Sequence, residues 1–276
     1  MSAPRAASTA LILAALIGLL AGCGGASSGG SPVAVVGGAQ AAENNGIPAP
    51  PPQLGSVVDI PVPADIAHLP LTTAAGTRTD LAAYAGKPVM IADFLTLCTD
   101  ICPMISANTA AMARDLVADG DAGKVALLEI SVDPRRDTPA RLRAYQNLFG
   151  GPLPGWTLLR ASPADTAKLW GYFHVWYHRA KEDKPPSIDW LTHKPLTYDV
   201  DHSDNLIFLD AAGHERFVVD SGPNVGRHLP PAKLVQFLDG QGVRDLYHPD
   251  KVETWTVGQG MQVLSWLTGR RLAVPS

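Results

Sequence analysis

No block of basic residues occurs in this chain, whose 22 lysines and arginines are outnumbered by 26 acidic residues. Because nucleic-acid-binding proteins concentrate positive charge on one face, we expect no nucleic-acid partner. Cysteine is scarce as well, with three in 276 residues, and two of these lie in one short stretch. The 46% of hydrophobic residues nevertheless suffices for a full core, and the length allows one large domain with extensions.

A hydrophobic run long enough to span a bilayer is missing from the N-terminus. The apolar residues 9–20 follow a single basic residue, Arg5, and fall short of the roughly 20 that a membrane span needs, so residues 1–22 are predicted to be an export signal. The sequence Leu-Ala-Gly-Cys that ends at Cys23 resembles the lipobox of bacterial lipoproteins. This resemblance implies lipidation of Cys23 and a lipid-anchored protein at the cell membrane, facing the periplasm or the cell exterior. The alternative is an ordinary signal peptide with an incidental cysteine.

Bulky apolar side chains are almost absent from residues 24–54, which are rich in Gly, Ser, Ala, Asn and Pro. This composition predicts a flexible linker over residues 23–55. We therefore expect a folded domain over residues 56–240 and a C-terminal extension over residues 241–276. In that extension, a helix near Trp255 to Trp266 is expected to pack on the domain rather than to touch a membrane.

Strand and helix patterns alternate in the middle of the chain. The predicted elements are a strand at 89–95, a helix at 103–119, a strand at 125–132 and a helix at 139–150, followed by a strand at 156–159 and a helix at 162–170. Such alternation is typical of right-handed βαβ units, and predicts an α/β fold with a largely parallel central sheet flanked by helices. Residues 206–209 and 216–219 add a β-hairpin, and a helix at 231–238 is expected to close the domain.

The chemistry is concentrated in Cys98 and Cys102, which stand where the strand at 89–95 gives way to a helix. Two cysteines four residues apart can form a disulfide or bind one metal ion, and a helix N-terminus favours the thiolate that both reactions need. Thioredoxin-like oxidoreductases place two residues between their cysteines, whereas this chain has three, which favours metal binding. A purely structural disulfide is the third interpretation.

Two thiolates suit a soft ion such as cuprous copper, but are too few for a closed zinc site with four ligands. A histidine is the expected third ligand, and His202 is the first candidate because it lies in a polar segment between two apolar strands. His174 and His178 are the second candidate pair, since the alternation of residues 173–178 predicts a strand with both rings on one face. The other five histidines are expected to be solvated surface residues: His68, His193, His214, His228 and His248.

Three motifs together resemble the Sco/SenC family of copper-binding assembly factors. They are CTDICP at residues 98–103, SVDPRRDTP at 131–139 and YDVDHS at 198–203, in the family's order. The resemblance implies a thioredoxin-like fold in which Cys98, Cys102 and His202 bind copper, as Cu(I) or Cu(II). It also implies delivery of that copper to the dinuclear copper centre of a haem–copper oxidase.

The chain departs from the family pattern at Thr99, where the family usually has proline. A proline lost from the loop adds an N–H and loosens the backbone, which is expected to shift metal affinity or reduction potential. The rival function is a thiol–disulfide reductase that uses Cys98 and Cys102 as its redox pair and keeps client cysteines reduced. A peroxide-consuming enzyme on the same fold is disfavoured, because no arginine stands in the motif to activate peroxide.

Overall fold

Three hydrophobic runs form the centre of the sheet in the computed structural model, which describes residues 43–249 and 254–272. The parallel neighbours are β4 (Val89–Phe94), β5 (Ala126–Ser131) and β6 (Trp156–Arg160). Every side chain of β4 and β5 is buried, as expected for strands that are covered on both faces. The predictions for Cys23 and for the export signal lie outside the described residues.

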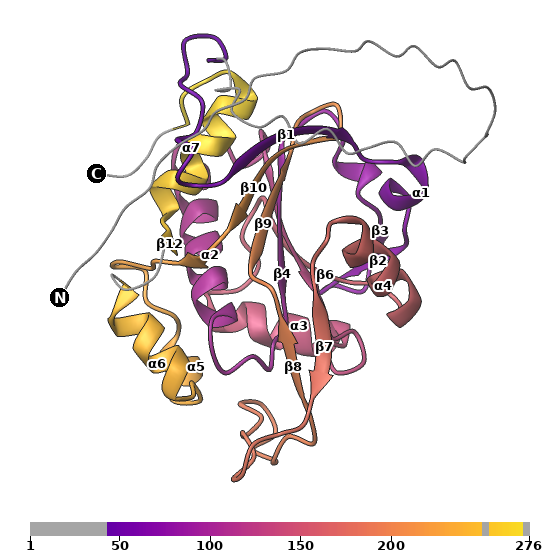
Figure 1. Cartoon of the computed structure of the whole chain (residues 1–276), viewed down its shortest axis with the longest axis vertical. Coiled ribbons are helices and arrows are strands. Elements are labelled where there is room, and N and C mark those ends of the chain that lie inside the picture. Colours follow the sequence, from indigo (N-terminus) through magenta and orange to yellow (C-terminus); the bar gives the residue numbers. More distant parts are fainter. Residues whose placement is uncertain (1–42, 250–253, 273–276) are drawn as a thin grey trace, which may run out of the picture. The chain divides into compact units, whose positions relative to one another are not determined.

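Five further strands extend this centre into an eight-stranded sheet with the order β1-β10-β9-β4-β5-β6-β2-β3 (Figure 1). They are β1 (Ser56–Pro61), β2 (Leu71–Thr73), β3 (Arg78–Thr79), β9 (Asn205–Leu209) and β10 (His214–Asp220). Each of them pairs in an antiparallel manner. The α/β fold with an added β9–β10 hairpin is confirmed, but within this eight-stranded sheet parallel pairing is confined to the three central strands. The alternation of elements predicts parallel pairing only for neighbouring strands that a single helix connects, and no outer strand is connected in this way to the strand beside it.

Helices flank this sheet, and four of them begin after a residue whose side chain caps them. The helices are α1 (Ala64–Ala67), α2 (Cys102–Ala118), α3 (Pro139–Leu148), α4 (Pro163–Tyr172), α5 (Ala232–Val235), α6 (Gly240–Tyr247) and α7 (Val257–Thr268), with a 3₁₀ turn at Ala82–Tyr84. The Thr138 hydroxyl accepts a hydrogen bond from the Arg141 N–H, and the Ser162 hydroxyl accepts one from the Asp165 N–H. Both caps start α3 and α4 where the sequence predicts them.

The predicted strand at residues 173–178 is wrong. Helix α4 continues to Tyr172, and His174 has a left-handed backbone with φ of 56°, so the alternation of aromatic residues there does not mark an extended segment. Strand β7 covers only Tyr177–Ala180 and pairs with β8 (Asp199–His202) outside the main sheet. The helix expected at 231–238 is likewise shorter, because α5 ends at Val235 and α6 follows as a separate helix.

The C-terminal extension packs on the domain, as predicted. The buried face of α7 includes Met261 and Leu264, and the helix lies against α2, where a Cβ on Gly260 would stand 3.0 Å from Met112. The short strands β11 (Gly222–Pro223) and β12 (Thr254–Trp255) pair in parallel beside it. No helix in the described ranges has the length and apolar character needed to cross a membrane.

The folded part begins before residue 56. The Asn44 side-chain amide donates a hydrogen bond of 2.8 Å to the Trp266 carbonyl, and Leu54 is buried. Residues 43–55, which composition assigns to the linker, therefore lie against the domain. The sequence did not predict this packing, because proline and small residues contribute little to the hydrophobic pattern that marks a folded segment.

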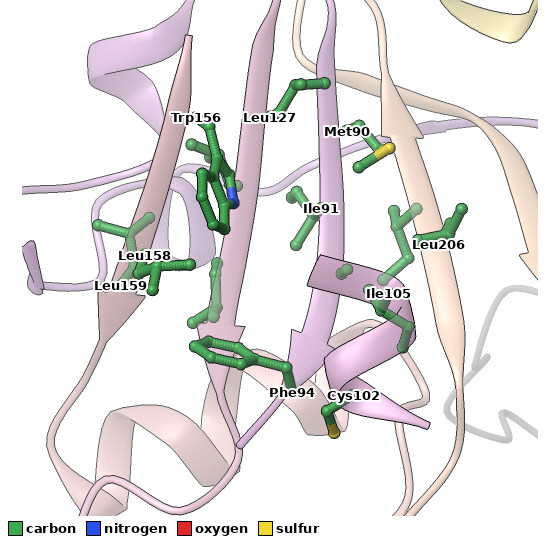
Figure 2. Close-up of a cluster of buried hydrophobic side chains, with 14 of the residues drawn as sticks. Met90, Ile91, Phe94, Cys102, Ile105, Leu127, Trp156, Leu158, Leu159 and Leu206 are labelled. Atoms are coloured by element: carbon green, nitrogen blue, oxygen red, sulfur yellow. The ribbon is translucent and has the colours of Figure 1, made fainter. Parts of the chain in front are cut away.

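The core is formed by the sheet together with α2, α3, α4 and α7. Figure 2 shows the side chains of Phe94 and Cys102 at the same end of this core, where β4 ends and α2 begins. Both are fully buried. One of the two cysteines is thus fixed by packing.

Candidate metal centre

The junction between β4 and α2 brings the two cysteines together as free thiols. Cys102 is the first residue of α2 and is buried, while Cys98 lies in the preceding loop and is partly exposed. The Cys102 N–H donates a hydrogen bond of 3.4 Å to Cys98 Sγ. An N–H at the start of a helix has no partner within the helix, so it is available to stabilise a thiolate.

His202, the last residue of β8, completes the group. Its Nε2 lies 3.3 Å from Cys102 Sγ, and one ligand atom from each of Cys98, Cys102 and His202 lies within 4.8 Å of the others. The sequence predicts a polar segment between two strands at His202, whereas this residue ends a strand that pairs with β7. The candidate ligands therefore come from three places in the fold: a loop, a helix start and a strand end.

Asp93 orients the imidazole of His202, a role that the sequence did not reveal. The Nδ1 of His202 lies 2.6 Å from Asp93 Oδ2 and 2.9 Å from the Ser203 carbonyl, while Asp93 Oδ1 accepts a hydrogen bond from the Asn205 N–H. The two oxygens near Nδ1, from the Asp93 carboxylate and the Ser203 carbonyl, are both acceptors, so a ring proton sits on Nδ1. Nε2 then faces the sulfur atoms. The available signal was a carboxylate in an otherwise apolar strand, because a buried charge requires a partner.

The electrostatic state of the three ligand residues follows from this geometry. A hydrogen bond from Cys102, together with His202, holds the pKa of Cys98 well below its usual range, although burial opposes it. Burial and the neighbouring Cys98 raise the pKa of Cys102 well above its usual range. Burial opposes protonation of His202, but the hydrogen bond to Asp93 and the nearby Cys98 raise its pKa above the usual value. The metal-free site is thus arranged around a Cys98 thiolate.

Acidic side chains surround the ligands. A cavity of about 220 Å³ is lined by Cys98, Thr99, Asp100, Ile101, Asp199, Val200, Asp201, His202, Asp204 and Asp239, with no lysine or arginine among them. Burial, with Cys98 next in importance, raises the pKa of Asp100 to about 8. Burial also raises the pKa of Asp204 to about 7, against the attraction of His202. A cavity of this composition favours a cation over an anion.

A second buried network supports the approach to Cys98. The Asp137 carboxylate accepts hydrogen bonds from the Thr96 hydroxyl at 2.5 Å and from the Ser131 hydroxyl at 2.6 Å. The Trp190 indole donates to the Thr96 carbonyl at 2.6 Å. Trp190 belongs to the long segment before β8, residues 181–198, and this segment is therefore attached to the loop that carries Cys98.

The alternative metal site at His174 and His178 is not formed. The two rings do not share a strand face, because His174 lies outside β7, and His178 instead lies 3.5 Å from Asp201. His68 and His214 pair with Asp80 and Asp59 at the surface. Among the residues that the structure describes, Cys98, Cys102 and His202 are the group of three that could hold a metal ion.

Comparisons with known proteins cover the part of the chain that carries the three motifs at residues 98–103, 131–139 and 198–203. A family model described as SCO1/SenC matches residues 65–225, and no curated protein matches the chain. Copper-bound ScoI of Bradyrhizobium japonicum is a similar solved structure, with 29% identity over 62% of this chain and 97% of that chain, and a TM-score of 0.46. Copper-bound Sco1 of yeast is similar at 21% identity, over 61% of this chain and 82% of that chain, with a TM-score of 0.44.

Proposed function

Because the chain belongs to the SCO1/SenC family, we propose that it is a copper chaperone that holds its cargo through Cys98, Cys102 and His202. The observation that carries this proposal is the gathering of two sulfur atoms and an imidazole nitrogen within 4.8 Å. Two thiolates and one imidazole satisfy Cu(I), whereas a closed zinc site needs a fourth ligand. No fourth residue joins the group among the described residues.

The surrounding residues have defined parts in taking up this cargo. Asp93 holds one proton of His202 on Nδ1, so Nε2 is the nitrogen that can bind copper, in place of its own proton. Cys98 and His202 line the cavity, whereas Cys102 is fully buried. The Cys98 thiolate faces a cavity whose wall includes no lysine or arginine, so the cavity favours a cation over an anion.

The client and the location are parts of the same proposal. The family resemblance supports delivery of copper to the dinuclear copper centre of a haem–copper oxidase. The lipobox-like sequence before Cys23 supports a lipid anchor at the cell membrane and a position outside the cytoplasm. In such an oxidising compartment, a bound metal protects the pair from forming a disulfide.

Copper binding can be tested with the reduced protein carrying Cys23→Ser, in which only Cys98 and Cys102 supply thiols. In anaerobic competition with a Cu(I) chelator, we expect one equivalent of tightly bound copper. Cys98→Ala, Cys102→Ala and His202→Ala should each weaken binding by at least about tenfold. His178→Ala is the matched control, because His178 is an exposed histidine of the neighbouring strand. Binding that is indifferent to His202→Ala would refute the proposal.

A thiol–disulfide reductase is the second candidate, and the hydrogen bond between the two free cysteines favours it. Each turnover would pass two electrons and two protons from Cys98 and Cys102 to a client disulfide, which leaves the pair oxidised. The reductase would be supported if the protein reduces a model disulfide and His202→Ala does so at the same rate. It would be excluded if the protein reduces the disulfide no faster than free thiols do.

A further inference from the structure

The loop between the two cysteines is attached to the start of α6. The Asp239 N–H donates a hydrogen bond of 2.8 Å to the Thr99 carbonyl, and the Thr99 hydroxyl lies 3.3 Å from Asp239 Oδ2 and donates to it. Within the described parts of the chain, these are the hydrogen bonds that join residues 99–101 to a segment distant in sequence. In Figure 1, α6 lies beside the start of α2, in agreement with these contacts.

Asp239 is itself held in place by the helix that it caps. Its Oδ1 accepts hydrogen bonds from the Gln241 N–H at 2.7 Å and from the Gly242 N–H at 2.8 Å. The other oxygen is the one that receives the Thr99 hydroxyl. A single carboxylate therefore joins the N-terminus of α6 to the residue that follows Cys98.

Gly242 allows α6 to approach the loop closely. A Cβ at this position would lie 2.7 Å from the Thr99 carbonyl oxygen and 2.8 Å from Asp100 Cα. Both atoms belong to the backbone, so an added methyl group cannot be accommodated by turning a side chain. Gly240, two positions earlier, has no such restriction, since its Cβ would meet only the flexible end of Arg244 at 3.4 Å.

We propose that Asp239 and Gly242 are positioning residues for the copper site, which hold Thr99 and Asp100 and thereby fix Cys98 relative to Cys102. Cys102 needs no such support because it is buried in the core at the start of α2. Cys98 lies in a loop, and metal sites bind tightly only when the surrounding residues hold each ligand in place. Helix α6 lies outside residues 65–225, so this support is an addition to the part that the family model matches.

The inference takes the proposed copper function as its premise, but its test begins with metal-free protein, so the two can fail separately. The chain carries Cys23→Ser, and the rate of Cys98 alkylation is measured near neutral pH for Gly242→Ala and for Gly240→Ala as matched control. The methyl group of Gly242→Ala is expected to displace the loop and to move Cys98 Sγ relative to the Cys102 N–H. We expect the alkylation rate to change by about threefold or more, because the loop that presents Cys98 Sγ is displaced, and Gly240→Ala to match the parent.

Copper affinity supplies the second measurement. In chelator competition, Gly242→Ala should bind Cu(I) about tenfold more weakly than Gly240→Ala, the loss expected when a residue that supports a ligand is disturbed. Thr99→Val should reproduce part of both effects and Thr99→Ser should not, because only the serine retains the hydroxyl that Asp239 accepts. Circular dichroism and thermal melting confirm that each variant is folded.

The outcomes separate the two proposals. Equal alkylation rates for Gly242→Ala, Thr99→Val and the parent would overturn the positioning role, whatever the copper result. A changed alkylation rate in Gly242→Ala, together with a parent protein that binds no copper, would uphold the positioning role and reject the copper function. If Gly242→Ala fails to fold, the comparison of Thr99→Val with Thr99→Ser decides.

Discussion

Asp93 and His202 are 109 positions apart in the sequence, and yet their side chains meet at 2.6 Å beside the two cysteines. Asp93 is fully buried and the His202 side chain is only 4% exposed. Water cannot replace either partner at such a position, so the pair fixes which imidazole nitrogen faces the sulfur atoms.

Replacing Asp93 with asparagine should impair copper binding without removing a ligand. An asparagine offers one acceptor where the carboxylate offers two, so either His202 or the Asn205 N–H loses its acceptor. We expect the Cu(I) affinity to fall by about tenfold, measured by chelator competition. Asp59→Asn is the matched control, because Asp59 makes the same kind of contact to His214 at the surface. Equal affinities of the two variants would show that the Asp93 charge has no effect on the site.

Copper should stabilise the folded protein, because the ligands lie far apart in sequence and come together only on folding. At a free Cu(I) concentration of 100 times the dissociation constant, the gain in unfolding free energy is about 2.7 kcal/mol. Thermal melting under anaerobic conditions measures this gain. Cys98→Ala should melt at nearly the same temperature with and without copper, and an unchanged copper-induced shift in that variant would place the ion elsewhere.

The buried Glu129 carboxylate should make stability depend on pH. It accepts hydrogen bonds from the Ser106 hydroxyl and the Trp156 indole, and burial raises its pKa to about 7. A folded protein that binds this proton more tightly than the unfolded chain loses stability as the pH rises from about 4.5 to 7, by about 3 kcal/mol in all.

Denaturant unfolding of Glu129→Gln isolates this contribution, since glutamine does not titrate. Between pH 4.5 and 7.5, the unfolding free energy of the parent should fall by about 3 kcal/mol relative to that of Glu129→Gln. Glu43→Gln, at an exposed position, serves as control and should follow the parent at every pH. If the difference in unfolding free energy between the parent and Glu129→Gln did not change with pH, the raised pKa of Glu129 would be contradicted.

The ion pair of Arg141 and Asp189 should hold the long segment before β8. The two guanidinium nitrogens donate to Asp189 at 2.9 and 2.7 Å, and both side chains are largely buried, with 13% and 8% exposed. Removing one partner of a buried pair costs about 3 kcal/mol. We therefore expect Arg141→Met to lower the unfolding free energy and to speed proteolysis within residues 181–198. Arg135→Met, which changes an exposed arginine, should do neither.

The sequence was sufficient for the elements whose signals are local. The buried strands β4 and β5 and the capped helices α3 and α4 are read directly from apolar runs and from Thr138 and Ser162. Cys98 and Cys102 were recognisable because their residue type, spacing and position at a strand end each point to the same chemistry.

Long-range relationships could not be predicted in this way. Asp93 stands in a strand pattern that requires apolar residues, and its partner lies 109 positions away. The positive φ of His174 is set by how α4 ends, whereas its alternating neighbours imitate a strand. The contact of Asp239 with Thr99 depends on where an extra helix docks, which no local pattern encodes.

The hydrogen bond from Asn44 to the Trp266 carbonyl fixes the point at which the N-terminal part of the chain joins the domain. Residues 43 and 44 share a cavity wall with the Asp210 turn, and Leu209 pairs with Val89 at the beginning of β4. Cys98 follows the other end of that strand. Under the proposed lipid anchor, the chain therefore enters the domain at the end of β4 opposite to the copper ligands. The residues at which the chain enters the domain and the residues that bind copper are then separate surfaces, so a client that docks on the cysteines need not contact residues 43 and 44.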